Sequence, residues 1–178
     1  VMAKGGLFVR EGEAFRKVDD RPIVDVCLQG DGVVAATRDD LFHVGADGLT
    51  PFAPEGGYRS HNATYDMEDG TQLLEEPVTF GPVSRIASYG GTVYGLRPRQ
   101  VVMFDGAAVT PEIADWGLLP SPVVRDLASL GSRLFIATDR GLGVLRGMSL
   151  TTLDGAGGLP FEDPTCLARG FDRDLWIG

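Results

Sequence analysis

The chain has 178 residues, of which 43% are apolar and 23% charged, and it contains 25 Gly and 11 Pro. No apolar run approaches the roughly 18 residues of a transmembrane helix, and so many turn-forming residues disfavour a helical bundle. The 16 basic and 25 acidic residues give a net charge of −9, so the surface repels phosphate backbones. The sequence shows no basic patch, and we therefore expect no nucleic-acid binding and no membrane span.

The first predicted element is a β-hairpin over residues 4–18, which turns at Glu11-Gly12. A unit of four short strands follows over residues 22–53. Its two hairpins turn at 30–32 and 45–48, where glycines interrupt runs of β-branched and apolar residues. Such turns between β-rich runs are typical of antiparallel hairpins.

Two more four-stranded units are predicted over residues 78–113 and 120–153, and a last hairpin over residues 164–178. Each unit begins with an apolar anchor residue, then has a tight turn and a second β-rich run. These anchors are 60, 41 and 40 residues apart, a period typical of propeller blades. The anchors are Val26, Ile86, Leu127 and Leu167.

The last unit stops after its first hairpin, whereas residues 4–18 have the pattern of a second hairpin. We therefore expect the N-terminal strands to complete the fourth blade, which would leave no open sheet edge. The predicted fold is an all-β, single-domain β-propeller over residues 1–178, with four blades of four antiparallel strands. Trp176 and Phe135 share one repeat position, and we expect both to be buried between blades.

The repeat also carries a family resemblance. The motifs Gly158-Leu159-Pro160 and Leu175-Trp176-Ile177-Gly178, with Leu167 between them, resemble the two-component-regulator propeller repeat. The third unit fits more loosely, through Leu119-Pro120-Ser121 and the run 134–138. The strand pattern of this repeat matches most of the chain, and its characteristic residues match roughly half of it. It implies a bacterial sensor module, although such propellers usually have six or seven blades.

Residues 54–77 interrupt the period and are expected to project as a loop from one face. Long insertions in repeat proteins often lie on the binding face, and the alternative is a tolerated surface loop. Tyrosine and arginine are favoured as interface anchors. The candidate partner contacts in this insertion are Tyr58, Arg59, His61 and Tyr65.

A second group of candidates lies just before the anchor residues, where polar side chains recur at one repeat position. They are expected either to line an axial channel or ligand pocket, or to form a satisfied Arg–Asp network. These axial candidates are Asp25, Arg85, Arg125 and Asp126. Arg97 and Arg99, with Arg38 and Arg140 in the equivalent loops, are the candidate contacts for an anion or acidic partner on one rim.

No catalytic motif is found: Gly-x-Ser-x-Gly and the phosphate-binding loop are both absent. Cys27 and Cys166 lack metal-ligand spacing, and His43 alternates with apolar residues on a predicted strand. We therefore expect no enzymatic activity, no cofactor and no metal.

The predicted function is a non-enzymatic protein-interaction module, as a subunit of a larger assembly. The alternative is a ligand-sensing or glycan-binding propeller domain with its site at the axial mouth. A protein partner is expected, and the oligomeric state is left open. No charged segment precedes an apolar stretch, which favours the cytoplasm; because the chain opens with Val, a removed leader and a periplasmic location stay open.

Overall fold

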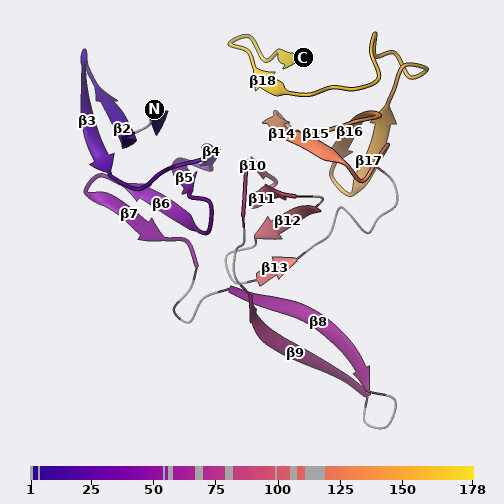
Figure 1. Cartoon of the computed structure of the whole chain (residues 1–178), viewed down its shortest axis with the longest axis horizontal. Coiled ribbons are helices and arrows are strands. Elements are labelled where there is room, and N and C mark those ends of the chain that lie inside the picture. The colour runs from indigo at the N-terminus through magenta and orange to yellow at the C-terminus, as the bar shows by residue number, and fades with distance from the viewer. Residues whose placement is uncertain are drawn as a thin grey trace.

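The computed structural model describes residues 2–3, 5–53, 55, 58–66, 70–78, 82–98, 100–104, 108–110 and 119–178. This part of the chain is all-β and forms five separate sheets. Figure 1 shows the sheets as spokes around a common centre, with β4, β10, β14 and β18 innermost. Among the described residues, no helix has the length and hydropathy needed to cross a membrane.

Two of the sheets are four-stranded antiparallel meanders, as the repeat predicts. Tight turns with glycine at positive φ join their strands, for example at Gly30 and Gly131. Blade 1 consists of β4 (Asp25–Gln29), β5 (Gly32–Ala36), β6 (Leu41–Gly45) and β7 (Gly48–Pro51). Blade 3 consists of β14 (Val124–Leu130), β15 (Arg133–Thr138), β16 (Gly141–Arg146) and β17 (Ser149–Leu153).

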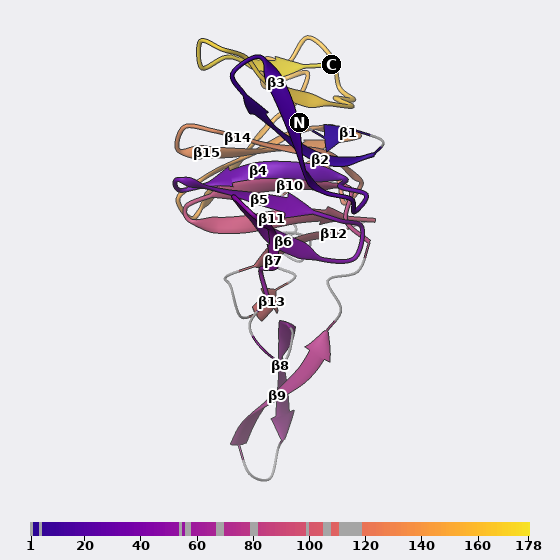
Figure 2. The same cartoon turned by 90° about the vertical axis from the view of Figure 1, so that its left-hand side faces the viewer.

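Blade 2 has the same four strands and two more at its outer edge. Its meander contains β10 (Arg85–Tyr89), β11 (Thr92–Arg97), β12 (Gln100–Phe104) and β13 (Ala108–Thr110). Much of the insertion expected as a loop is instead a hairpin of β8 (Tyr58–Asp66) and β9 (Gly70–Val78). β8 pairs in parallel with β13, and the hairpin extends away from the blades (Figures 1 and 2).

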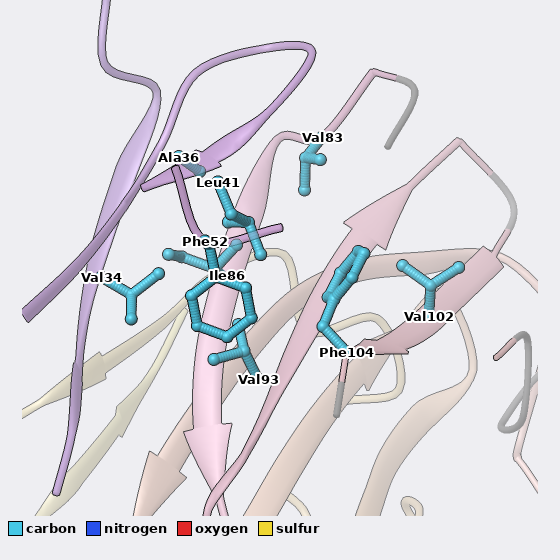
Figure 3. Packing of buried hydrophobic residues seen from close by; sticks show 9 residues of the cluster. All are labelled: Val34, Ala36, Leu41, Phe52, Val83, Ile86, Val93, Val102 and Phe104. Atoms are coloured by element: carbon cyan, nitrogen blue, oxygen red, sulfur yellow. The ribbon is translucent and has the colours of Figure 1, made fainter. Parts of the chain in front are cut away.

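The hydrophobic core lies between neighbouring blades rather than within any one of them. Between blades 1 and 2, Val34 and Leu41 of blade 1 pack in one cluster with Ile86, Val93 and Phe104 of blade 2 (Figure 3). A second cluster fills the space between blades 2 and 3. A third joins blade 3 to the C-terminal strands. Blade 2 is therefore buried by a blade on each side, and blade 3 by blade 2 and the C-terminal strands.

The two ends of the chain form separate sheets, which corrects the predicted closure of a fourth blade. The N-terminal sheet contains β1 (Met2–Ala3), β2 (Gly6–Glu11) and β3 (Ala14–Asp19), and the C-terminal hairpin contains β18 (Leu167–Arg169) and β19 (Leu175–Ile177). β1 pairs with Gly6 and Leu7 on the edge of β2 that the closing strand was expected to occupy. β3 contacts β7 and β18 contacts β14, so each end is attached to a different blade.

The prediction that Phe135 and Trp176 are both buried is confirmed for Phe135 and wrong for Trp176. Phe135 is 8% exposed, because Leu167, Leu175 and Ile177 of the C-terminal hairpin cover blade 3. Trp176 is 67% exposed. Among the described residues, no sheet covers the equivalent side chain on the C-terminal hairpin.

Candidate functional site

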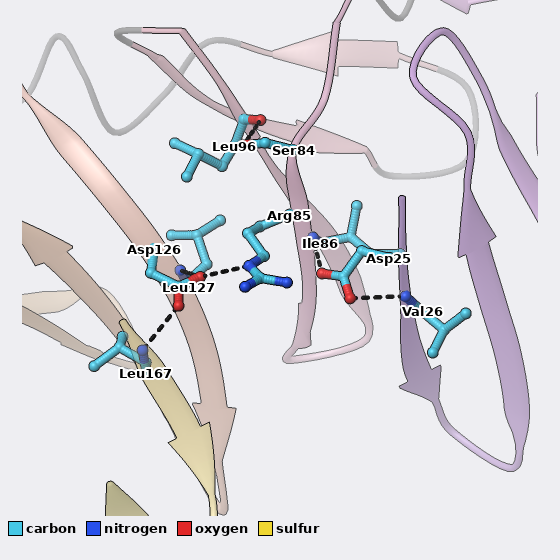
Figure 4. Close-up of polar contacts among 9 residues, drawn as sticks. All are labelled: Asp25, Val26, Ser84, Arg85, Ile86, Leu96, Asp126, Leu127 and Leu167. Atoms are coloured by element: carbon cyan, nitrogen blue, oxygen red, sulfur yellow. Dashed lines mark hydrogen bonds and ion pairs between the residues drawn. The ribbon is translucent and has the colours of Figure 1, made fainter. Parts of the chain in front are cut away.

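Two aspartates at the axial position bind backbone groups of two sheets at once (Figure 4). Asp25 accepts hydrogen bonds from the amide of Val26, at 2.9 Å, and from the amide of Ile86 in blade 2, at 2.9 Å. Asp126 does the same with the amides of Leu127 and Leu167, both at 2.8 Å. Each carboxylate therefore ties an anchor residue to the anchor of the next sheet.

Blade 2 has Arg85 at this position and makes the link through its side chain. The Arg85 guanidinium forms an ion pair with Asp126, with Nε at 3.1 Å from Oδ1. The Asp126 side chain is only 3% exposed, whereas that of Arg85 is 46% exposed. A buried carboxylate needs such compensation, and two amides and a guanidinium provide it. The contacts of Asp25, Arg85 and Asp126 thus fit the predicted Arg–Asp network.

The same side chains also line an axial cavity of about 510 Å³. Arg169, from the C-terminal hairpin, adds a second guanidinium to its wall. Burial raises the pKa of Asp25, against the opposing effects of its two amide donors and the charge of Arg85. The axial cavity is therefore lined both by Asp25, Arg85 and Asp126 of the Arg–Asp network and by the additional guanidinium of Arg169.

A second cavity, of about 490 Å³, lies where the innermost strands begin; we call it the mouth pocket. Three guanidinium-bearing side chains line it, Arg38, Arg97 and Arg125, with Val24 and Pro98 among its apolar walls. No Asp or Glu belongs to its lining within the described part of the chain. Burial lowers the pKa of Arg97, because its guanidinium is already partly desolvated.

Backbone hydrogen bonds hold the mouth pocket in shape. The Val83 amide donates to the carbonyl of Arg38 at 2.9 Å, which joins the segment before blade 2 to the loop of blade 1. The Ser84 amide donates to the carbonyl of Leu96 at 2.9 Å. These bonds fix the backbone on which Arg38 and Arg97 lie, so less conformational entropy of the backbone is lost on binding.

The structure groups the predicted site residues differently from the sequence prediction. Asp25, Arg85 and Asp126 meet in the axial cavity, whereas Arg125 joins Arg97 in the mouth pocket. Arg99 lies outside the described residues. For Tyr58, Arg59, His61 and Tyr65 the structure describes the backbone, on β8, but not the side chains.

Arg169 is the one charged residue of the axial cavity that the sequence reasoning missed. It lies two residues after the anchor Leu167 on β18. Side chains two apart on a strand share a face, so alternation groups Arg169 with the anchor Leu167 and not with the axial candidates, and the repeat position gave no signal for it.

No protein-family model matches the chain, and no curated protein matches its sequence. Among solved structures, the chain is similar to the extracellular domain of the hybrid two-component system BT3049 from B. thetaiotaomicron, at 13% identity and a TM-score of 0.54. The match covers 97% of this chain and 24% of that one, so the chain spans about a quarter of its length.

Two weaker matches were also found. The extracellular domain of BT4673 from the same organism is 14% identical, with a TM-score of 0.45 over 99% of this chain and 29% of that one. The WD40 β-propeller domain of Doa1 is 15% identical, with a TM-score of 0.39 over 85% and 60%. At the level of fold, the expected likeness to two-component-regulator propellers is confirmed by the first match.

Proposed function

We propose that the chain is a non-enzymatic recognition module that binds an acidic segment of a protein partner at the mouth pocket. The observation that carries this proposal is the gathering of Arg38, Arg97 and Arg125 around one cavity, without a described acidic residue in its lining. On a chain with a net charge of −9, such a local excess of positive charge needs an explanation.

The chemistry of the pocket suits carboxylates. An arginine guanidinium is planar and can bind a carboxylate through two parallel hydrogen bonds. Arg38 and Arg125 are exposed, whereas Arg97 is half-buried, so the charges are presented at different depths. A peptide carrying two or three acidic side chains could contact the three arginines, with Val24 and Pro98 beside its apolar atoms.

A ligand-sensing domain is the second candidate, and the axial cavity favours it. Arg85 and Arg169 line about 510 Å³ of space beside Asp25, an arrangement suited to a small polar ligand such as a sugar acid. The BT3049 structure, which the chain resembles in fold, is described as an extracellular domain of a two-component system, which agrees with a recognition role. In this second candidate, the site is the axial cavity and not the mouth pocket.

The affinity of a labelled hexaglutamate peptide, measured by fluorescence anisotropy, tests the first candidate. We expect Arg38→Gln and Arg125→Gln each to weaken binding about tenfold, because each removes one charge-assisted contact. Arg146→Gln is the matched control, since Arg146 is also exposed but lines other cavities.

Inorganic phosphate and galacturonate serve as the small probes. Binding of galacturonate that is lost in Arg169→Gln but kept in Arg125→Gln would favour the ligand-sensing candidate. Equal effects of Arg125→Gln and Arg146→Gln on the peptide would contradict a site at the mouth pocket.

A further inference from the structure

The hairpin of β8 and β9 is attached to the blades only at its base, within the described part of the chain. β13 pairs with it at Arg59 and Ser60, the second and third residues of β8. Beyond that point β8 and β9 pair with each other, up to Asp66 opposite Gly70. Strands of nine residues span roughly 30 Å, so the far end of the hairpin lies well away from the blades (Figure 2).

The sequence is most acidic at this far end of the hairpin. Asp66 ends β8, and Glu68 and Asp69 follow it in the sequence before β9 begins at Gly70. No other window of four residues in the sequence contains three acidic residues. We call residues 66–69 the acidic segment; of these, the structure describes the backbone of Asp66.

The mouth pocket has the opposite charge and the same number of charged groups. Arg38, Arg97 and Arg125 line it. Arg38 and Arg125 are exposed, and neither forms an ion pair within the part of the chain that the structure describes. Three carboxylates within four residues thus match three guanidiniums around one cavity. Such complementarity selects a partner and steers its approach.

The acidic segment of one chain lies far from the mouth pocket of the same chain. The hairpin pairs with β13, the outermost strand of the blade 2 meander. The pocket lies instead at the inner strands, with Ser84 before β10 and Val124 at the start of β14 in its lining. Since the hairpin extends outward from the blades (Figure 1), its far end is placed to meet another molecule.

We infer that the acidic segment of a second copy of this chain fills the mouth pocket. This inference rests on the proposed function, because it names the partner of the same site. The carboxylates of the segment accept hydrogen bonds from the guanidiniums, and Met67 supplies apolar atoms for the walls at Val24 and Pro98. The contact joins unlike surfaces, so it builds a ring or a filament unless it is made twice about a two-fold axis.

Sedimentation velocity of the full chain over a range of concentrations tests the inference. We expect species larger than the monomer at low salt and their dissociation at high salt, because salt screens exposed charges. The variant Asp66→Asn/Glu68→Gln/Asp69→Asn should associate at least about tenfold more weakly, since it removes charge-assisted contacts.

A matched control removes three acidic residues from other exposed turns and strands. It should associate like the unmodified chain, because its net charge equals that of the first variant while its acidic segment is intact. The control is Glu13→Gln/Asp31→Asn/Asp47→Asn.

Charge reversal tests the pairing of the two surfaces. Asp66→Lys/Glu68→Lys/Asp69→Lys should be monomeric and still bind hexaglutamate, because its mouth pocket is unchanged. Arg38→Glu/Arg125→Glu should be monomeric and lose hexaglutamate binding. A chain with both sets of substitutions should associate again, since the two charges are exchanged. Hexaglutamate binding is measured on dilute chain, below the concentrations at which copies associate.

A chain that stays monomeric at low salt but binds hexaglutamate would overturn the inference and leave the proposed function standing. Association weakened equally by the acidic-segment variant and its control would also overturn it. So would a monomer that binds hexaglutamate more tightly once a linker replaces residues 56–75, which would indicate that the hairpin folds into its own pocket. A monomeric chain without any hexaglutamate binding would contradict both the inference and the proposed function.

Discussion

Blade 3 and the C-terminal hairpin have nearly the same inner strands but very different environments. Leu134-Phe135-Ile136 in blade 3 corresponds to Leu175-Trp176-Ile177 in the hairpin. Phe135 is 8% exposed and Trp176 is 67% exposed. The difference does not come from the strands themselves, because both pair with their first strand in the same register.

The comparison shows that burial in this fold depends on the next sheet. Phe135 is covered by Leu167, Leu175 and Ile177, which belong to the hairpin that follows blade 3. Stability should therefore be concentrated in the three complete blades and fall toward the two ends.

The largest contrast is expected between Phe135→Ala and Trp176→Ala. Phe135→Ala should lower the free energy of unfolding by about 3–5 kcal/mol, because it opens a cavity between two packed sheets. Trp176→Ala should lower it by less than about 1 kcal/mol, because the side chain is already exposed. Urea unfolding measures both values, and equal losses would mean that the sheets do not bury each other as described.

The next contrast is between the two axial aspartates. Asp126→Ala should cost about 1–3 kcal/mol, because it leaves the Leu167 amide and the Arg85 guanidinium without their acceptor. Asp25→Ala should cost less, since Asp25 is half-buried and its burial already raises the pKa. Hydrogen exchange should show faster opening of β18 in Asp126→Ala alone; unchanged exchange at Leu167 would argue against the link between sheets.

A smaller, pH-dependent effect is expected near the N-terminal sheet. Hydrogen bonding to Arg21 lowers the pKa of Asp19 to about 2, and Arg21 in turn lies over the Phe42 ring of blade 1 at 4.2 Å. Since the folded-state pKa is below the unfolded value, this contribution is complete above about pH 4 and is lost as the pH falls toward 2. It should amount to less than about 2 kcal/mol, because the Arg21 side chain is 40% exposed.

Asp19→Asn is the test of that effect. The stability of the unmodified chain relative to this variant should decline between about pH 4 and pH 2. Thermal unfolding across this range measures the difference. A difference that stays constant with pH would exclude the Asp19–Arg21 pair as its source.

The smallest effect on stability is expected for the hairpin of β8 and β9. Replacing residues 56–75 by a Gly-Ser linker removes most of two strands that, among the described residues, pair with the blades only through β13. The free energy of unfolding should change by less than about 1 kcal/mol, since shortening a surface connection has little entropic effect. Binding of hexaglutamate should be unchanged. Loss of that binding would indicate that the peptide binds the hairpin and not the mouth pocket.

The repeat period predicted the three complete blades and both terminal hairpins because each strand and turn is a local feature. Glycines such as Gly30 and Gly131 mark the turns, and the spacing of the anchors gives the order of the sheets. The prediction failed where two segments far apart in the sequence had to meet. The pairing of β2 with β1 instead of β19 depends on where each sheet is attached, which no local pattern specifies.

The candidate site was predictable in its residues but not in its grouping. The repeat position identified Asp25, Arg85 and Asp126 as axial. The repeat position also assigned Arg125 to the axial residues, whereas Arg125 lines the mouth pocket together with Arg97. Neighbouring residues on a strand point to opposite faces, so Arg125 and Asp126 serve two different cavities.

The proposal that the mouth pocket is a recognition site is tested most directly by amide chemical-shift mapping during a titration with hexaglutamate. We expect the largest shifts at Ser84, Leu96 and Val124, which line the pocket. Amides at the far ends of the same strands, such as Gly90 and Gly131, should not move. Shifts centred on those turns, or no shifts at saturating peptide, would contradict it.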